Sequence, residues 1–224
     1  MADQDRAQQG NEQDQARSGG RDKGARAGRP RYALYGLAGV GLLAVAGAGY
    51  YLYREKSVEK PRHKVLEVDG QFEVREYPEL LIAESSVAGG RDFALDQGFS
   101  KLADYIFAKS RAGERVPMTA PVFSSGGGGD NWLTRFVMPA HFTRDTLPQP
   151  GAGVRIDTLP ARKVAVMHFP GAADEAAFAE REAQLRSWIG AKKYETRGDV
   201  ERAFYNSPFI PGPLRRTEVL IPIV

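Results

Sequence analysis

The chain has 224 residues, of which 26% are charged, a net charge of +3 and no cysteine. The absence of cysteine excludes disulfides, a thiol nucleophile and Cys-based zinc or iron–sulfur sites. The basic excess lies in residues 1–31 and 54–64, so residues 65–224 are close to neutral. Because nucleic-acid-binding domains present a basic face, we expect no nucleic-acid partner.

The first 53 residues divide into a polar tail and an apolar segment. Residues 1–31 contain no large aliphatic residue after Met1, so they cannot bury enough apolar surface to fold and are predicted to be disordered. Residues 32–53 carry no charge, have tyrosines near both ends, and as a helix would span roughly 30 Å. They are predicted to form a single transmembrane helix, in contact with a lipid bilayer.

Two other interpretations of residues 32–53 are a buried helix and a cleavable signal peptide. Basic clusters at both ends argue against the first, and the long leader and long apolar core argue against the second. Residues 54–64 then form a basic juxtamembrane linker. The basic residues on the amino side slightly outnumber those in the linker, which favours an exported domain on a bacterial-type inner membrane.

The domain, residues 65–224, begins with a predicted hairpin. Residues 65–68 and 71–77 read as strands joined by a tight turn at Asp69-Gly70, and residues 80–87 as a third strand. Asp92 is a predicted N-cap for a helix whose buried face comprises Leu95, Phe99, Leu102 and Ile106. Pro117 and Pro121 bracket a predicted short strand, and another covers residues 132–138.

The second half of the domain repeats this plan. Residues 154–158 and 163–169 read as strands, and Asp174 is a predicted cap for a helix with Phe178, Leu185 and Ile189 on one face. Strands at 200–205 and 217–224 complete the sheet.

An internal duplication accounts for this order. At a displacement of 82 residues, Pro78 falls on Pro160 and Ala83 on Ala165; at 83 residues, Leu102 falls on Leu185 and Met138-Pro139 on Ile221-Pro222. We therefore predict an α+β fold in which two pseudo-twofold units form a curved antiparallel sheet with one helix per half. A cleft between such units favours ligand binding over catalysis.

Six segments of the domain, taken in order, resemble the SOUL family of haem-binding proteins. They are FEVREYP (72–78), GFSKLADYIF (98–107), MTAPV (118–122), FVMP (136–139), VAVMHFPG (164–171) and YNSPF…LRRTEV (205–219). The resemblance implies a distorted antiparallel barrel flanked by two helices, a fold also similar to the drug-binding domains of bacterial multidrug-responsive regulators. It further implies non-covalent binding of haem or a related tetrapyrrole in an open apolar groove.

On this hypothesis the groove comprises Phe99, Ala103, Met118 and a proline-rich rim at 208–213 that includes Phe209 and Ile210. Basic side chains such as Lys101 or Arg215 would meet the propionates, and apolar burial would supply most of the affinity. His168 is a candidate iron ligand, although alternation along its strand also fits a structural histidine. The iron ligand and the oligomeric state are left undetermined.

Glu218 supports two alternative functions. As an inward-facing carboxylate with a pKa raised by burial, it could be the counter-charge for a cationic or amphipathic small molecule. With Tyr205 or Tyr77 it could instead act as the general base of a small-molecule hydrolase. A salt bridge to Arg215 or Arg216 is the structural interpretation of the same residue. Because no catalytic motif is present, we predict a non-enzymatic carrier, buffer or sensor.

Overall fold

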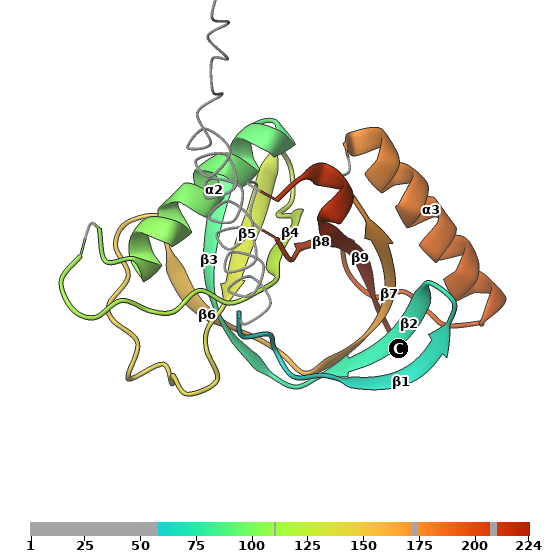
Figure 1. Ribbon diagram of the computed structural model, residues 1–224, viewed down its shortest axis with the longest axis horizontal. Coiled ribbons are helices and arrows are strands. Elements are labelled where there is room, and N and C mark those ends of the chain that lie inside the picture. Colours follow the sequence, from blue (N-terminus) through green and yellow to red (C-terminus); the bar gives the residue numbers. More distant parts are fainter. Residues whose placement is uncertain (1–57, 110, 172–173, 207–209) are drawn as a thin grey trace, which may run out of the picture. The chain divides into compact units, whose positions relative to one another are not determined.

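Nine antiparallel strands form one curled sheet with two helices on its outer face (Figure 1). The computed structural model describes residues 58–224 except 110, 172–173 and 207–209. The elements in chain order are β1 (Lys64–Asp69), β2 (Phe72–Tyr77), β3 (Leu80–Ala88), α2 (Arg91–Ile106), β4 (Val122–Gly126), β5 (Asn131–Val137), β6 (Arg155–Leu159), β7 (Arg162–Pro170), α3 (Glu175–Ala191), β8 (Glu201–Phe204), the 3-10 turn η1 (Gly212–Leu214) and β9 (Arg216–Ile223).

The strand order shows the duplication directly. The sheet runs β1-β2-β7-β9-β8-β4-β5-β3-β6, so β7-β9-β8 in one half corresponds to β3-β5-β4 in the other. The two halves exchange strands, because β2 of the first unit pairs with β7 of the second, and β6 of the second pairs with β3 of the first. The pseudo-twofold axis therefore passes between β4 and β8.

Register confirms one predicted displacement and corrects another. Glu73 lies opposite Val166 and Arg155 lies opposite Glu84, so equivalent residues of these pairs are 82 positions apart. Val137 lies opposite Ile82, whereas the residue opposite Val164, the counterpart of Ile82, is Pro222. The final strands are thus displaced by 85 residues rather than 83, because the intervening loops differ in length.

The sheet is an open half-barrel rather than the closed distorted barrel that was expected. Strands β1 and β6 are its two edges and do not pair with each other. The predicted strand between Pro117 and Pro121 is also wrong. Only Thr119 makes an isolated bridge there, and β4 begins at Val122. Prolines lack the N–H that a sheet ladder requires.

The two helices are predicted correctly, but one cap is not. α3 begins after Asp174, whose side chain accepts a hydrogen bond from the Ala177 N–H, as expected. α2 has Gly90 at its N-cap, and Asp92 lies within the first turn. An acidic side chain there still stabilises the helix through the positive end of its dipole.

Alternation along the strands gives the sheet two apolar faces. On the outer face, the α2 cluster includes Ala83, Leu102, Ile106, Phe136 and Met138, and the α3 cluster includes Ala165, Met167, Phe178, Leu185 and Ile221. The inner, concave face carries the third cluster, which includes Tyr77, Ile82, Phe123, Val166 and Leu220. All the residues of the three clusters lie between positions 72 and 223, so the described part contains its own cores.

The predicted tail and membrane segment, residues 1–31 and 32–53, lie outside the described residues. Within the described part of the chain, no helix has the length and apolar character needed to cross a bilayer.

Candidate ligand-binding site

Three of the predicted groove residues lie together on the outer face at α2. Phe99 and Met118 are half-buried against the α2 cluster, and the Phe99 ring meets Phe136 edge to face at 5.3 Å between centroids. Ala103 is buried on the same helix, one turn beyond Phe99. Side chains packed on one side and partly exposed on the other provide an apolar surface without further rearrangement.

The predicted rim is only partly described. Ile210 is buried, and its carbonyl accepts a 2.8 Å hydrogen bond from Arg215 Nε. Phe209 lies outside the described residues. Arg215 therefore holds the rim loop, in addition to being a candidate partner for propionates. Lys101 is exposed and lies beside Gly153, in the loop before β6.

His168 and Glu218 lie elsewhere. They are opposite each other on β7 and β9, on the inner face with Val166 and Leu220. Because Phe99 and Met118 lie on the outer face, the sheet separates the two groups of predicted site residues. His168 Nδ1 is buried without a hydrogen-bond partner among the described residues, but it cannot reach a ring held by Phe99.

Glu218 is fully buried and neutralised by ion pairs. Its two oxygens accept hydrogen bonds from Arg75 at 2.8 and 3.1 Å, from Arg216 at 3.1 Å and from the Tyr205 hydroxyl at 2.8 Å. The predicted contacts with Arg216 and Tyr205 are confirmed. Arg75, 143 residues away, was not predicted.

The contacts reverse the expected direction of the Glu218 pKa. Burial alone raises the pKa of Glu218, but the hydrogen bonds and the positive charge of Arg75 outweigh burial and lower it. The pKa of the Tyr205 hydroxyl is raised, first by burial and then by the adjacent carboxylate. At neutral pH the cluster therefore contains an ionised Glu218 and a protonated Tyr205.

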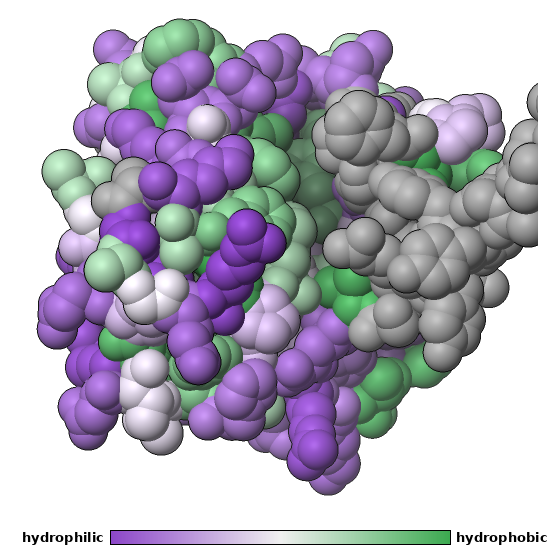
Figure 2. All heavy atoms as spheres, turned by 60° about the vertical axis from the view of Figure 1, so that its left-hand side comes forward, coloured by the Kyte–Doolittle hydropathy of each residue, from purple (hydrophilic) through white to green (hydrophobic). Residues whose placement is uncertain are grey.

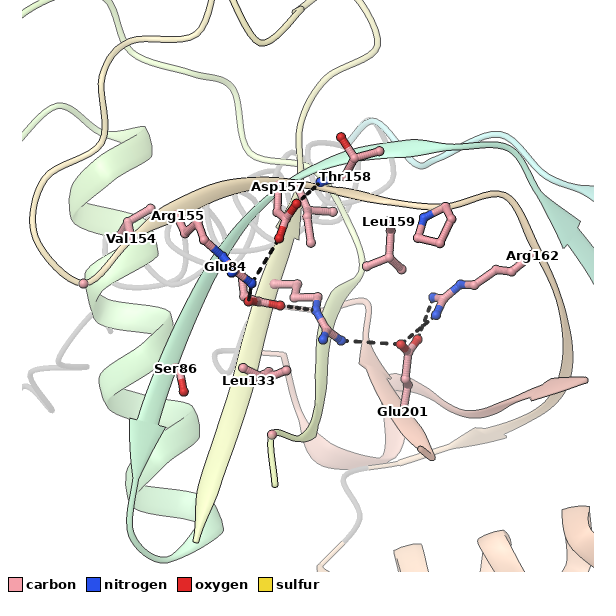
Figure 3. A pocket seen from close by; sticks show the side chains of 15 residues that line it. Glu84, Ser86, Leu133, Val154, Arg155, Asp157, Thr158, Leu159, Arg162 and Glu201 are labelled. Atoms are coloured by element: carbon pink, nitrogen blue, oxygen red, sulfur yellow. Dashed lines mark hydrogen bonds and ion pairs between the residues drawn. The ribbon is translucent and has the colours of Figure 1, made fainter. Parts of the chain in front are cut away.

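A second ionic network crosses the inner face at the other half of the sheet (Figure 3). Glu84 accepts from Arg135 and Arg155, each at 2.7 Å, and Glu201 accepts two bonds of 2.7 Å from Arg162. Sequence reasoning missed these residues, because opposite charges on alternate positions of a strand look like an ordinary solvent-exposed face. Their inward direction follows only from the curl of the sheet.

This network lines a cavity of about 850 Å³, which we call the charged groove. Its apolar walls include Ile82, Leu133, Val154 and Leu159. Arg155 is the most accessible of its arginines, with 68% of the side chain exposed. The charged groove can accommodate a ligand with both apolar and polar groups. Figure 2 shows hydrophobic side chains gathered in the middle of the face that it draws, bordered by hydrophilic ones.

Comparison with known proteins gives the family. The model of the family described as SOUL heme-binding protein matches residues 58–222. The chain belongs to the SOUL family. The match covers both halves of the SOUL domain, including all nine strands from β1 to β9 except the last residue of β9. A search of curated proteins gave no match.

Solved structures similar to this SOUL domain share its fold at low sequence identity. The crystal structure of the EcmrR C-terminal domain has a TM-score of 0.52 and 14% identity, covering 69% of this chain and 97% of that one. A hydrolase from Listeria innocua has a TM-score of 0.51 and 10% identity, covering 71% and 94%. The EcmrR–DNA complex has a TM-score of 0.53 and 12% identity, covering 86% and 70%. The first of these shows that a domain of this fold crystallises by itself.

The residues present suit a tetrapyrrole held by apolar contact. Around Phe99 the chain offers an aromatic edge, aliphatic surface and the soft thioether of Met118, but none of the described histidines. His63 and His141 lie outside the three apolar clusters, and both are exposed. Among the described residues, no three His, Asp or Glu side chains converge into a metal site. A porphyrin ring would therefore be held through its faces, with Met118 the nearest candidate iron ligand.

Proposed function

We propose that this SOUL domain binds haem or a related tetrapyrrole non-covalently and without catalysis, as a carrier, buffer or sensor. The observation that carries the proposal is the family match over residues 58–222, together with the half-buried Phe99 and Met118 on one apolar surface. A flat ring placed there would gain free energy by covering the exposed parts of these side chains. Lys101 would meet a propionate.

We further propose that residues 32–53 anchor the domain to a bilayer, with the domain exported from a bacterial cytoplasm. The support is the uncharged length of this segment, its tyrosine ends and its basic flanks. Such an anchor would confine tetrapyrrole binding to the membrane surface, where apolar porphyrins partition.

The test is a titration of residues 57–224 with hemin and, separately, with iron-free protoporphyrin IX. Hemin is followed by its Soret absorbance and protoporphyrin by its fluorescence. We expect saturable binding of both, because the ring supplies most of the contact. Phe99→Ala should weaken both by about tenfold, as expected for losing part of an aromatic contact. Trp188→Ala, which removes a half-buried aromatic from α3, is the matched control and should leave binding unchanged.

His168→Ala separates the two groups of predicted residues. Retention of the Soret band in this variant would agree with a ring on the outer face, and its loss would place the ligand at His168. Absence of saturable binding of either porphyrin would refute the proposal. Thermal unfolding of each variant shows whether a loss of binding reflects a loss of folding.

The two alternatives that depend on Glu218 are disfavoured by its contacts. A counter-charge for a cationic ligand must have negative charge to spare, whereas Glu218 already accepts from Arg75, Arg216 and Tyr205. A general base must be accessible and basic, whereas Glu218 is fully buried and its pKa is lowered, since the hydrogen bonds and charge of Arg75 outweigh burial. Tight binding of a cationic dye, lost in Glu218→Gln, would restore the first alternative.

A further inference from the structure

A second large cavity lies at the ends of β1, β2 and β7, where β9 also ends. It has a volume of about 1060 Å³, and we call it the basic groove. It is lined by Arg62, His63, Lys64, Glu76, Tyr77, Pro78, Pro160, Ala161, Arg162, Lys163, Arg197, Pro222, Ile223 and Val224. The lining therefore combines segments from before β1, from the β6–β7 turn and from the end of the domain.

Positive charge in the basic groove is not balanced by neighbouring carboxylates. Within the described residues, Arg62, Lys64, Lys163 and Arg197 make no ion pair within 4.0 Å. Glu76 is the single carboxylate side chain in the lining. It lies opposite both Lys64 on β1 and Lys163 on β7, so it offsets only part of their charge.

The floor of the basic groove is apolar. Pro78, Pro160, Pro222 and Ile223 contribute it, and Tyr77 is buried at its edge with the His63 ring 5.0 Å away. Burial and the charge of Arg75 lower the pKa of His63, so its imidazole is neutral at physiological pH. The positive charge therefore belongs to the arginines and lysines and does not depend on histidine protonation.

We propose that the basic groove binds the phosphate-bearing head group of an anionic phospholipid. Unpaired guanidinium and ammonium groups suit the phosphate, and the proline-lined floor suits the glycerol and upper acyl carbons. The position in the chain supports a lipid source. Arg62 follows Tyr53, the end of the predicted membrane segment, by nine residues. Even fully extended, nine residues span roughly 30 Å, and basic clusters so close to a membrane segment attract anionic lipids.

The experiment is vesicle flotation of residues 57–224, which lack the predicted anchor, with phosphatidylcholine vesicles and with vesicles containing about one-third phosphatidylglycerol. We expect binding to the anionic vesicles alone. The combined substitution Arg62→Gln, Lys163→Gln and Arg197→Gln should weaken it by about 100-fold, as expected for three membrane-proximal charges. The control Lys109→Gln, Arg115→Gln and Arg186→Gln removes the same charge from exposed sites and should retain most of the binding.

Three results would overturn the proposal. One is no binding to anionic vesicles, and another is an equal loss in the groove and control variants, which would indicate general surface charge. The third is full displacement by millimolar inorganic phosphate at constant ionic strength, which would indicate a site for free phosphate. The measurement is independent of hemin binding, so either proposal can fail without the other. Circular dichroism and thermal unfolding confirm that both triple variants are folded.

Discussion

At the scale of single residues, the inner face of the half-barrel depends on the pairing of Arg75 with Glu218. Both side chains are almost fully buried, at 1% and 0% exposure, and Glu73 also accepts from Arg75 at 2.6 Å. Removing one partner leaves the other charge buried without compensation, which is far more costly than removing both. The pair therefore constrains which substitutions the inner face tolerates.

We expect Arg75→Met to lower the free energy of unfolding by about 3–5 kcal/mol, and Glu218→Gln to have a similar effect. The double variant Arg75→Met/Glu218→Leu should be much less destabilised than the sum of the two single changes. Urea unfolding of all four proteins measures this coupling. Additive effects would show that the contact contributes little.

The same pair gives a pH dependence. Burial opposes ionisation of Glu218, but Arg75 outweighs it, so the folded-state pKa lies below the ordinary glutamate pKa of about 4.3. The unfolded state then binds the proton more readily, so the contribution of Glu218 is complete above this pH and is lost as the pH falls through the folded-state pKa. We expect the stability advantage over Glu218→Gln, measured by urea midpoints, to be constant from pH 7 to about pH 5 and to shrink below about pH 4. An advantage that grows on acidification would contradict this assignment.

At the scale of elements, α2 packs against β5 through a glycine. A Cβ added to Gly98 would lie 2.5 Å from Thr134 Oγ1 and 2.9 Å from its Cβ. These distances are too short for non-bonded atoms, so helix or strand must shift to accommodate a methyl group. Gly190 in α3 is the counterpart without this constraint, since a Cβ there would meet nothing within 4 Å.

We expect Gly98→Ala to lower the free energy of unfolding by about 1–3 kcal/mol. Gly190→Ala should raise it by up to about 1 kcal/mol, because alanine is the better helix former and the site is open. Chemical denaturation of the two variants gives opposite signs if the close approach of α2 to β5 is as described. Equal, small effects would mean that α2 can move away from the sheet at little cost.

At the scale of the whole molecule, the exchange of β2 and β6 between the halves makes the duplicated units interdependent. Separated, the first unit loses the partner of β2 on β7, and the second loses the partner of β6 on β3. Each half would also expose the inner apolar cluster, which draws residues from both.

We therefore expect residues 57–150 and 151–224, produced separately, to remain unfolded or to aggregate, and to form native structure only when mixed or co-produced. Far-ultraviolet circular dichroism and size-exclusion chromatography of each fragment and of the mixture test this. A stably folded single half would show that the duplication retains two independent folding units.

Much of this architecture could be predicted from local pattern. Period-two alternation located most strands, the Asp69-Gly70 turn fixed the first hairpin, and the spacing of Phe178, Leu185 and Ile189 gave the buried face of α3. The duplication also followed from sequence, because residues at equivalent positions face equivalent surroundings. These features depend on neighbours within a few residues or on simple repetition.

Other features required the tertiary structure. The sequence could not show that β1 and β6 stay apart, leaving a half-barrel, because closure depends on the summed twist and curl of nine strands. It could not show that His168 and Phe99 lie on opposite faces, or that Arg75 meets Glu218 across 143 residues. Which charge compensates which is decided by long-range register, and this register also determines that Glu218 is an ionised, neutralised carboxylate.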